Sequence, residues 1–414
     1  MGPRTAEPAA RLDAVQTPVI PVMGELIRQT PGCLSLGQGM VHWGPPRATL
    51  EAVHTALAQE QDLNPYGAVA GEPELHEALV QWLRRHHQIN LDDSSLLITA
   101  GSNMAFNAIV QVLCDPGDEL ILPIPWYFNH EMAIRLAGGR PVGVQAGLIP
   151  DPERLAAAIT ARTRAIVTVS PNNPSGAVWP PEVLAAINRL CAKHGLLHIS
   201  DEAYGLFGHG TTPVHSPGSA AGSGEHTITL GSLSKSHGMA GWRLGWAVVP
   251  RALQADLAKV QDTILICPPR LIQRAAIGAL SVGAGWCQER MVNLAARRLR
   301  VLAALNQADG PWRVLGPADG AFYALLELES ACSSDQAMER LIRKHGVALV
   351  SGRSFGLGGC CLRLSYGMLG DEELTLALER LQRGLREIAA DQPSPRPRAS
   401  AQPFTASPLA LGRM

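Results

Sequence analysis

The sequence predicts an α/β protein whose large domain contains a mainly parallel mixed sheet flanked by helices, followed by a smaller α+β domain. Through the middle of the chain, short apolar runs bounded by turn residues alternate with amphipathic stretches, which is the pattern of strand–helix–strand units. After about residue 300 the pattern changes to long helical stretches with a few strands. The 414 residues, 46% of them hydrophobic, are enough for two domains with buried cores.

Apolar runs with the length and flanking turn residues of buried strands lie at residues 96–99, 119–123, 165–169, 196–200, 227–230 and 244–249. A helix is predicted after Pro180 and Pro181, because the apolar residues that follow share one helical face and Gly195 can end it. In the smaller domain, strands are predicted at 348–350 and 361–365.

The predicted division of the chain follows its composition. Both ends lack sustained periodicity, the first being small and polar and the last rich in Pro, Ser and Ala, so both are predicted to be disordered. The segments are a disordered N-terminus (1–12), a segment that packs with the small domain (13–45), the large domain (46–300), the small C-terminal domain (301–390) and a disordered tail (391–414).

Charge and composition exclude several classes of function. Lys+Arg is 35 and Asp+Glu is 36, so there is no electrostatic reason to expect a nucleic acid or an anionic membrane as partner. No apolar run approaches the roughly 20 residues of a membrane span, and Met1 to Arg11 do not resemble a signal peptide. The eight cysteines lack zinc-binding spacing, so no metal site is expected. We expect a cytoplasmic protein with reduced cysteines.

A Ser- and Gly-rich loop at 231–245, which lies between two predicted strands, contains Lys235 and Arg243. A lysine in such a loop suits an imine with an aldehyde cofactor, because the small neighbours leave room for it. Ser232 and Arg243 can hold a phosphate group. The alternative is a flexible surface loop with a solvated lysine, and the apolar Trp242 argues against it.

This loop resembles the Schiff-base signature of class I and II aminotransferases, enzymes of fold type I that use pyridoxal 5′-phosphate (PLP). The resemblance extends, with its motifs in order, over roughly residues 15–390. It implies that the large domain binds PLP and that Lys235 is the Schiff-base lysine and the general acid–base. It also implies a homodimer with active sites shared across the interface.

Three further motifs resemble the family's cofactor contacts at the phosphate and the ring face. Gly101, Ser102 and Asn103 follow a predicted strand and open a helix, as in the phosphate cradle, although an ordinary helix N-cap explains them equally well. Tyr127 occupies the place of the aromatic ring that stacks on the pyridine ring, with core packing as the alternative. Tyr66 resembles the tyrosine that reaches the phosphate of a neighbouring subunit.

Two strand ends resemble the family's contacts to the polar atoms of the pyridine ring. Asn173, in a turn before Pro174, matches the asparagine that binds the phenolic oxygen and contacts the substrate, although alone it reads as a plain turn. Asp201 matches the carboxylate that pairs with the pyridine nitrogen, with a helix N-cap as the alternative. Tyr204 matches the tyrosine that donates to the phenolic oxygen.

The substrate side is predicted to contain Arg363, which resembles the family's clamp for the α-carboxylate, together with Gly39 and Trp43. The residues after Gly39 resemble a plant and cyanobacterial group that acts on aromatic amino acids and methionine, although Trp43 can equally pack between domains. Asp262 lies where dicarboxylate-specific members supply a second cation, and Arg270 is the nearest cation that can substitute.

We therefore expect a PLP-dependent aminotransferase that moves the amino group of an aromatic L-amino acid or methionine to a 2-oxo acid by a ping-pong mechanism. The alternatives are an aspartate-, kynurenine- or glutamine-type aminotransferase, a C–S lyase or an enzyme like aminocyclopropane-carboxylate synthase. A PLP-sensing transcription regulator needs a DNA-binding domain, for which residues 1–40 are too short.

Overall fold

The structure is a computed structural model that describes residues 8–59, 63–307 and 309–391. Residues 1–7 and 392–414, which form most of the two ends predicted to be disordered, lie outside the described residues. Residues 10–12 of the predicted N-terminal disorder instead belong to the short helix η1 (Ala10–Ala14).

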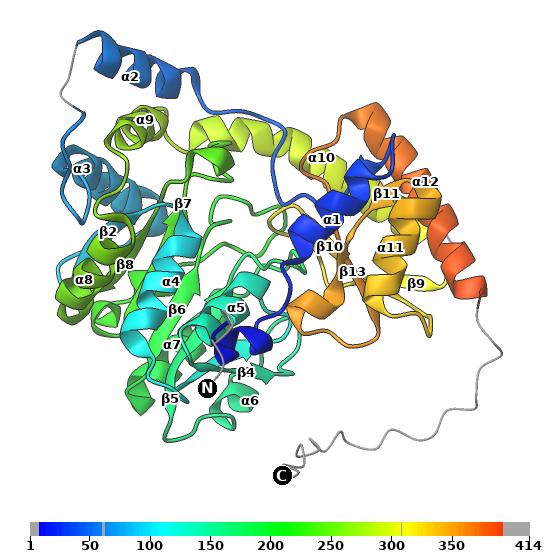
Figure 1. Cartoon of the computed structure of the whole chain (residues 1–414), viewed down its shortest axis with the longest axis horizontal. Helices are drawn as coiled ribbons and strands as arrows, with labels where there is room; N and C mark the ends of the chain where they lie inside the picture. Colours follow the sequence, from blue (N-terminus) through cyan, green and yellow to red (C-terminus); the bar gives the residue numbers. More distant parts are fainter. Residues whose placement is uncertain (1–7, 60–62, 308, 392–414) are drawn as a thin grey trace, which may run out of the picture.

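The larger part of the molecule is built on a mixed sheet, which comprises seven strands within the described ranges (Figure 1). Their spatial order is β2 (Ser94–Thr99), β8 (Gly245–Pro250), β7 (Thr227–Ser232), β6 (Leu197–Asp201), β5 (Thr163–Val169), β3 (Glu119–Pro123) and β4 (Arg140–Val144). β8 runs antiparallel to β2 and β7, and the other pairs are parallel. The mainly parallel mixed sheet and the strand predicted at each of the six apolar runs are confirmed, to within one or two residues at most ends.

β4 is a strand that the sequence did not predict. It lies at the edge of the sheet and all of its residues are partly or fully exposed, so it needs no continuous apolar run. Its sequence RPVGV accordingly contains only two strongly apolar residues.

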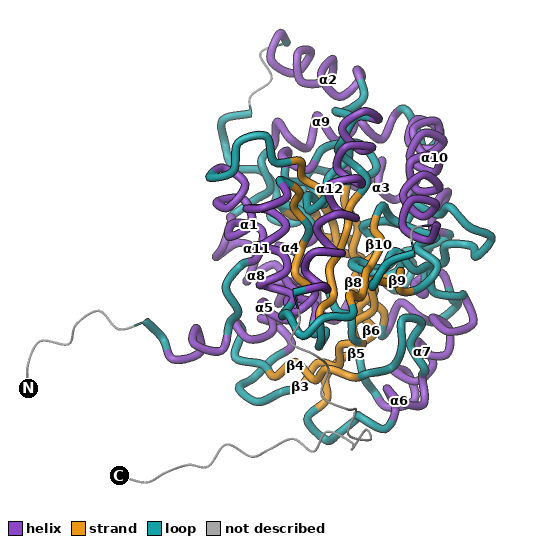
Figure 2. Tube along the Cα trace, turned by 90° about the vertical axis from the view of Figure 1, so that its right-hand side faces the viewer, coloured by secondary structure: helices purple, strands orange, loops and turns teal. Residues whose placement is uncertain are grey.

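Helices cover both faces of this sheet, because alternate strand residues point to opposite sides (Figure 2). One face packs on α4, α5 and α8, and Leu97 of β2 points to these helices. Leu96 and Ile98 of the same strand point the other way, to α3 and α9, and Ile166 of β5 points to α6 and α7. These helices are α3 (Pro73–Trp82), α4 (Ser102–Leu113), α5 (Phe128–Leu136), α6 (Pro152–Ala156), α7 (Pro181–His194), α8 (Gln254–Leu265) and α9 (Arg270–Ser281).

The helix predicted after Pro180 is confirmed as α7. Gly195 follows it with a φ of 64°, in the left-handed region where glycine carries no steric cost. Further helices are α2 (Arg47–Ala58), α10 (Gly285–Gln307) and the short elements η2 (Leu83–His87), η3 (Pro217–Ser219), η4 (Ser223–Glu225), η5 (Ala240–Trp242), η6 (Arg251–Leu253) and η7 (Gly352–Phe355).

The smaller part of the molecule contains an antiparallel sheet that, in the part of the chain described, has four strands. They are β12 (Val350–Ser351), β13 (Cys360–Ser365), β10 (Tyr323–Leu328) and β9 (Trp312–Leu315). The strand predicted at 361–365 is confirmed as β13, whereas β9 and β10 were not predicted. The strand predicted at 348–350 is divided into β11 (Val347–Ala348) and β12, which join different sheets.

The N-terminal segment lies against this smaller part (Figure 1). β1 (Leu34–Ser35) pairs in parallel with β11, and α1 (Val19–Arg28) packs on α11 (Ser334–His345). α12 (Asp371–Ala390) packs on α11 and α10. Residue 300, the predicted domain boundary, falls within α10, and the division of the chain into domains stays a prediction.

The helices in the described residues include none whose length and apolar character would suit a bilayer crossing. The eight cysteines are free, and Cys191, Cys287, Cys360 and Cys361 are buried.

A buried polar network fastens α7 to the sheet. Asn188 of α7 donates from Nδ2 to Thr227 Oγ1 (2.7 Å) and to Nδ1 of His198 (3.1 Å). Because Nδ1 accepts this bond, the proton of a neutral His198 sits on Nε2, which lies 2.9 Å from Thr168 Oγ1. Burial lowers the pKa of His198 to about 3, because a second proton would be desolvated, and the charge of His226 lowers it further.

We predict that His198 makes the fold sensitive to acid. The unfolded state binds a proton near the ordinary pKa of about 6.5, whereas the folded state does so only near 3, so stability falls as pH decreases below about 6.5. The loss is roughly 1.4 kcal/mol per pH unit, or roughly 2 kcal/mol between pH 6.5 and 5. Urea unfolding at pH 7, 6 and 5 should show a shallower decline for His198→Gln than for wild type.

His54 is exposed, so His54→Gln is the matched control and should keep the wild-type slope. Equal slopes for His198→Gln and wild type would contradict the assignment.

Candidate active site

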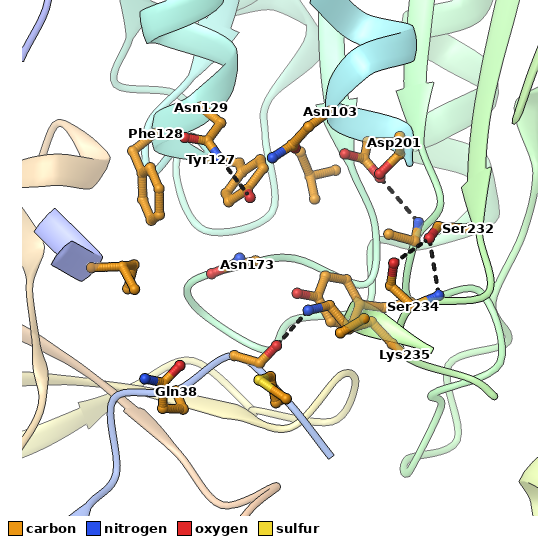
Figure 3. A pocket seen from close by; sticks show the side chains of 18 of the residues that line it. Gln38, Asn103, Tyr127, Phe128, Asn129, Asn173, Asp201, Ser232, Ser234 and Lys235 are labelled. Carbon is orange, nitrogen blue, oxygen red and sulfur yellow. Dashed lines mark hydrogen bonds between the residues drawn. The ribbon is translucent and has the colours of Figure 1, made fainter. Parts of the chain in front are cut away.

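A cavity of about 370 Å³ opens where the carboxyl ends of β5, β6 and β7 face the smaller part of the molecule. Such strand ends are where ligands bind in open α/β sheets. The cavity brings together predicted residues from distant parts of the chain: Gly39, Ser102, Asn103, Tyr127, Asn173, Asp201, Tyr204, Ser232, Lys235, Arg243 and Arg363. Figure 3 shows Asn103 and Tyr127 above the cavity and Gln38 and Lys235 below it.

The amine of Lys235 is held in this cavity by a backbone carbonyl, because Nζ donates to Gly39 O. Its pKa is lowered to about 8, chiefly by burial, with further lowering by the positive charges of Arg363 and Arg243. The carboxylate of Asp201 acts in the opposite direction. At pH 7 about a tenth of the amine is therefore uncharged and nucleophilic, far more than for a lysine with an ordinary pKa.

One end of the cavity has the features of a phosphate site. Gly101, which does not itself line the cavity, directly precedes α4 with a φ of 89°, and a Cβ there would lie 2.3 Å from Arg243 Nη2. Arg243 donates to Ala240 O (2.7 Å) and Ala100 O (3.3 Å), which fixes its guanidinium beside the start of α4. The helix N-terminus adds backbone donors and a positive partial charge. Ser102 and Asn103 line the same end.

Ser232 lies on the wall of the same cavity. Its Oγ is 2.7 Å from Ser234 Oγ and 3.0 Å from Leu244 O, and it accepts a bond from Ser234 N. This cluster fixes the first turn of the loop that leads to Lys235.

Asp201 is buried at the end of β6. One carboxylate oxygen lies 3.1 Å from His130 Nε2, and the other accepts a bond from Ala203 N. No lysine or arginine pairs with Asp201 in the described portions of the chain, so its charge lacks a full cationic partner there. A buried carboxylate of this kind suits a protonated nitrogen on a ligand.

His130 contributes to the site through its contact with Asp201, and the sequence did not predict it. It lies one turn after Tyr127 on α5, but its contact with Asp201 joins residues 71 positions apart, and no local pattern indicates that pairing. Its Nδ1 is buried without a hydrogen-bond partner among the described residues.

Tyr127 presents a partly buried aromatic ring to the cavity. Its hydroxyl accepts a bond from Asn129 Nδ2 (2.9 Å), and burial raises its pKa to about 12, so the hydroxyl stays protonated. The ring of His130 stands edge-on to it, with centroids 5.1 Å apart. Asn129, like His130, was not predicted.

Arg363 of β13 is almost fully buried at the opposite wall. It donates from Nη1 to Asn173 Oδ1 (2.8 Å) and from Nη2 to Gly37 O (2.6 Å). Its Nε has no partner among the described residues, so guanidinium donors remain for a carboxylate. Because Asn173 accepts through Oδ1, its amide nitrogen remains a donor for a ligand.

Tyr204 and Tyr323 form a buried pair of hydroxyls 2.7 Å apart. Burial raises the pKa of both, so both stay protonated, and Tyr323 also places its ring 4.5 Å from the Arg363 guanidinium. The sequence predicted Tyr204 but not Tyr323, which begins a strand that was itself not predicted.

Besides Gly101, two more of the predicted site residues lie outside the cavity lining. The ring of Trp43 stacks on Phe207 instead, with centroids 6.4 Å apart. Tyr66 is 77% exposed on the surface of the chain. Arg270 forms an ion pair with Glu72, with 2.9 Å between Nε and Oε1, and does not line the cavity.

The residues present fit PLP. Lys235 supplies an amine with a lowered pKa for the aldehyde of PLP. The wall near α4 supplies hydrogen-bond donors and Arg243 for its phosphate. Asp201 is a buried carboxylate without a lysine or arginine partner in the described residues, which suits a protonated pyridine nitrogen. The same ranges contain no cluster of three or more His, Cys, Asp or Glu that could hold a metal ion.

Comparisons with known proteins agree with this geometry. The family of class I and II aminotransferases matches residues 31–381. Aromatic aminotransferase ISS1 of Arabidopsis thaliana is 34% identical over 382 residues, which cover 90% of this chain and 94% of that protein. The aspartate/prephenate aminotransferase of Thermus thermophilus is 37% identical over 368 residues, which cover 87% of this chain and 93% of that protein.

Among solved structures, a double mutant of Thermus thermophilus aspartate aminotransferase superposes with a TM-score of 0.83 at 34% identity. The match covers 92% of this chain and 100% of that chain. The extent of these similarities and the constellation around Lys235 lead to one conclusion: the chain belongs to the class I and II aminotransferases and is a PLP-dependent transaminase.

Proposed function

We propose that this aminotransferase acts on aromatic amino acids or methionine and passes their amino group to a 2-oxo acid. The observation that carries the proposal is the charge distribution in the cavity. The lysine and arginine side chains that line it, among the described residues, are Lys235, Arg243 and Arg363. Arg243 lies at the phosphate end and Arg363 suits the α-carboxylate, so none of the three is left for a second carboxylate.

The rest of the substrate side is mainly apolar, although Gln38 and Asn129 also line it. Ile20, Met40 and Phe128 line it together with prolines from the N-terminal segment. Burying an aromatic or methionine side chain there contributes about 1.5–3 kcal/mol relative to leaving it exposed. An unpaired carboxylate would be desolvated at a greater cost.

We assign the chemistry to residues that surround the cofactor. PLP, when bound, supplies an electron sink for the charge left on the substrate α-carbon after proton removal. Lys235 Nζ takes that proton and returns it to the reacting centre, first as general base and then as general acid. Asp201, oriented by His130, holds the proton on the pyridine nitrogen, and Tyr204 donates to the phenolic oxygen.

The remaining residues bind and orient. Arg363 and Asn173 hold the α-carboxylate, and Asn173 also donates to the phenolic oxygen. Tyr127, which lines the cavity, would pack against the face of the cofactor ring. Ser102, Asn103, Ser232 and Arg243 would hold the phosphate, and Gly101 leaves room for Arg243 beside it. Exchange of amino acid for 2-oxo acid at this one site gives ping-pong kinetics.

We also propose a homodimer in which Tyr66 binds the phosphate in the neighbouring subunit. The exposure of this large aromatic ring, at 77%, supports the proposal, since tyrosine is enriched at interfaces. Sedimentation of the holoenzyme should give a dimer. Tyr66→Phe should release PLP more readily on dilution, while the protein remains a dimer. A fully active monomer would exclude the shared site.

We predict that Lys235 alone forms the covalent link to PLP. After borohydride reduction, wild type should retain a pyridoxyl group, and Lys235→Ala should retain none. Lys259→Ala is the control, because Lys259 is exposed and paired with Asp256, and it should label like wild type.

The pH dependence of this link follows from the lowered pKa of Lys235. The rate at which the apoprotein incorporates PLP should rise about tenfold per pH unit below pH 8 and level off above it, because only the neutral amine attacks. In the borohydride experiment, a pyridoxyl adduct on a lysine other than Lys235 would refute the assignment of Lys235 as the residue that binds PLP covalently.

Substrate preference tests the apolar pocket. We predict that phenylalanine, tyrosine, tryptophan or methionine exceeds aspartate in kcat/KM by about tenfold or more, since each factor of ten is roughly 1.4 kcal/mol. The measurement is the conversion of the PLP form to the pyridoxamine form with each amino acid in turn. Formation of one 2-oxo acid per pyridoxamine supports transamination, whereas release of ammonia or a thiol indicates a lyase.

Aspartate or glutamate reacting faster than every aromatic amino acid and methionine would overturn the proposed preference. Arg270→Ala would then show whether Arg270 supplies the second cation, because the change would selectively slow dicarboxylates.

A further inference from the structure

Tyr323 touches two parts of the site that the proposed function treats separately. It begins β10 opposite Ser365 of β13, is fully buried and lines the cavity. Its hydroxyl lies 2.7 Å from that of Tyr204, and its ring lies 4.5 Å from the guanidinium of Arg363.

The hydroxyl of Tyr323 is held in place by close packing. A Cβ added to Gly39 would lie 2.7 Å from it, so only glycine leaves room for the hydroxyl at that point of the N-terminal segment. The ring also packs edge-on against Tyr204, with centroids 5.5 Å apart. Tyr323 therefore has little freedom to turn away from Tyr204.

The direction of the hydrogen bond follows from the number of protons. Tyr204 and Tyr323 stay protonated, so each has one O–H to donate. If Tyr204 donates its proton to the phenolic oxygen of the cofactor, it can only accept from Tyr323. A hydroxyl that accepts one bond becomes a stronger donor in its own bond, because hydrogen-bonded chains polarise one another.

The ring of Tyr323 acts on Arg363 by a different interaction. Asn173 and Gly37 accept bonds from the ends of the guanidinium, and the ring lies within the distance of a cation–π contact. Phe355 lies farther away, at 5.4 Å. The ring thus stabilises a buried cation at the position where Arg363 meets a substrate carboxylate.

We propose that Tyr323 is a positioning residue that serves both halves of the site: its hydroxyl donates to Tyr204, and its ring supports Arg363. The inference rests on the proposed roles of Tyr204 and Arg363. It predicts that the two effects of Tyr323 can be separated by substitution, because one depends on the hydroxyl and the other on the ring.

The first arm is Tyr323→Phe, which removes the hydroxyl and keeps the ring. The visible absorption of the holoenzyme titrates with the proton shared between the Lys235 nitrogen and the phenolic oxygen. Donation from Tyr204 stabilises the anionic oxygen and lowers the midpoint, so weaker donation should raise it. We expect a rise of about half a pH unit, with the KM for the amino acid changed less than about twofold.

The second arm is Tyr323→Leu, which removes the ring as well. The probe is 3-phenylpropionate, a carboxylate that lacks an amino group and cannot react. Its dissociation constant from the holoenzyme, followed by the change in visible absorption, should rise about three- to thirtyfold relative to Tyr323→Phe.

Tyr366→Phe is the matched control, because Tyr366 is equally buried near the same strands and its hydroxyl has no partner among the described residues. It should leave both the midpoint and the dissociation constant at their wild-type values. If Tyr366→Phe shifts the midpoint as much as Tyr323→Phe does, the effect of Tyr323→Phe arises from general packing, and the proposal is overturned.

The outcomes distinguish this inference from the proposed function. If wild type forms no borohydride-stable pyridoxyl group, the proposed function fails and not only the role of Tyr323. If wild type titrates normally and Tyr323→Phe, folded by circular dichroism and loaded with PLP, keeps the same midpoint, the hydroxyl role alone is overturned. An unchanged affinity for 3-phenylpropionate in Tyr323→Leu overturns the role of the ring.

Discussion

Lys235 keeps its amine in a cavity that also contains Arg243 and Arg363, and an ammonium group there would be both desolvated and repelled by two guanidinium groups. The neighbouring charges therefore favour the neutral amine, which is the form that attacks an aldehyde. Asp201 reduces this effect without cancelling it. The balance requires three basic side chains and one carboxylate, from three distant segments of the chain, to line one cavity. Much of the fold can be understood as the means of placing them there.

The parallel strands provide most of that placement. Asp201 ends β6 and Ser232 ends β7, and because the two strands are adjacent and parallel, their final residues open on the same edge of the sheet. α4 begins at the same edge after β2, so its N-terminus faces the phosphate end of the cavity. Arg363 comes from the antiparallel sheet of the smaller part, which brings the carboxylate clamp to the opposite wall.

Where each residue lies in the fold explains whether it could be predicted from the sequence. Strand-end residues such as Asp201 and Lys235 follow apolar runs and stand in a fixed order, so local pattern and family resemblance identified them together. His130 and Tyr323 act through contacts across 71 and 119 residues, and neither carries a local signal of its partner. β4 escaped prediction because an exposed edge strand needs no continuous apolar run. Trp43 was predicted to contact the substrate, with packing between domains as the alternative. Its ring stacks on Phe207, and a sequence pattern does not distinguish these two uses of a tryptophan.

The N-terminal segment, far from the other site residues in sequence, completes the electrostatic arrangement with backbone carbonyls. Gly37 O accepts from Arg363 and Gly39 O accepts from Lys235, so two of the three basic side chains are held by one short stretch of chain. The stretch can approach this closely because it carries no Cβ at these positions, where one would lie 2.3 Å from Met23 Sδ and 2.7 Å from the Tyr323 hydroxyl. A carbonyl dipole can hold a cation without neutralising it, whereas a carboxylate would pair with it. The segment therefore orients Lys235 and Arg363 without adding a negative charge, which would raise the pKa of the Lys235 amine and neutralise Arg363 before a substrate carboxylate binds.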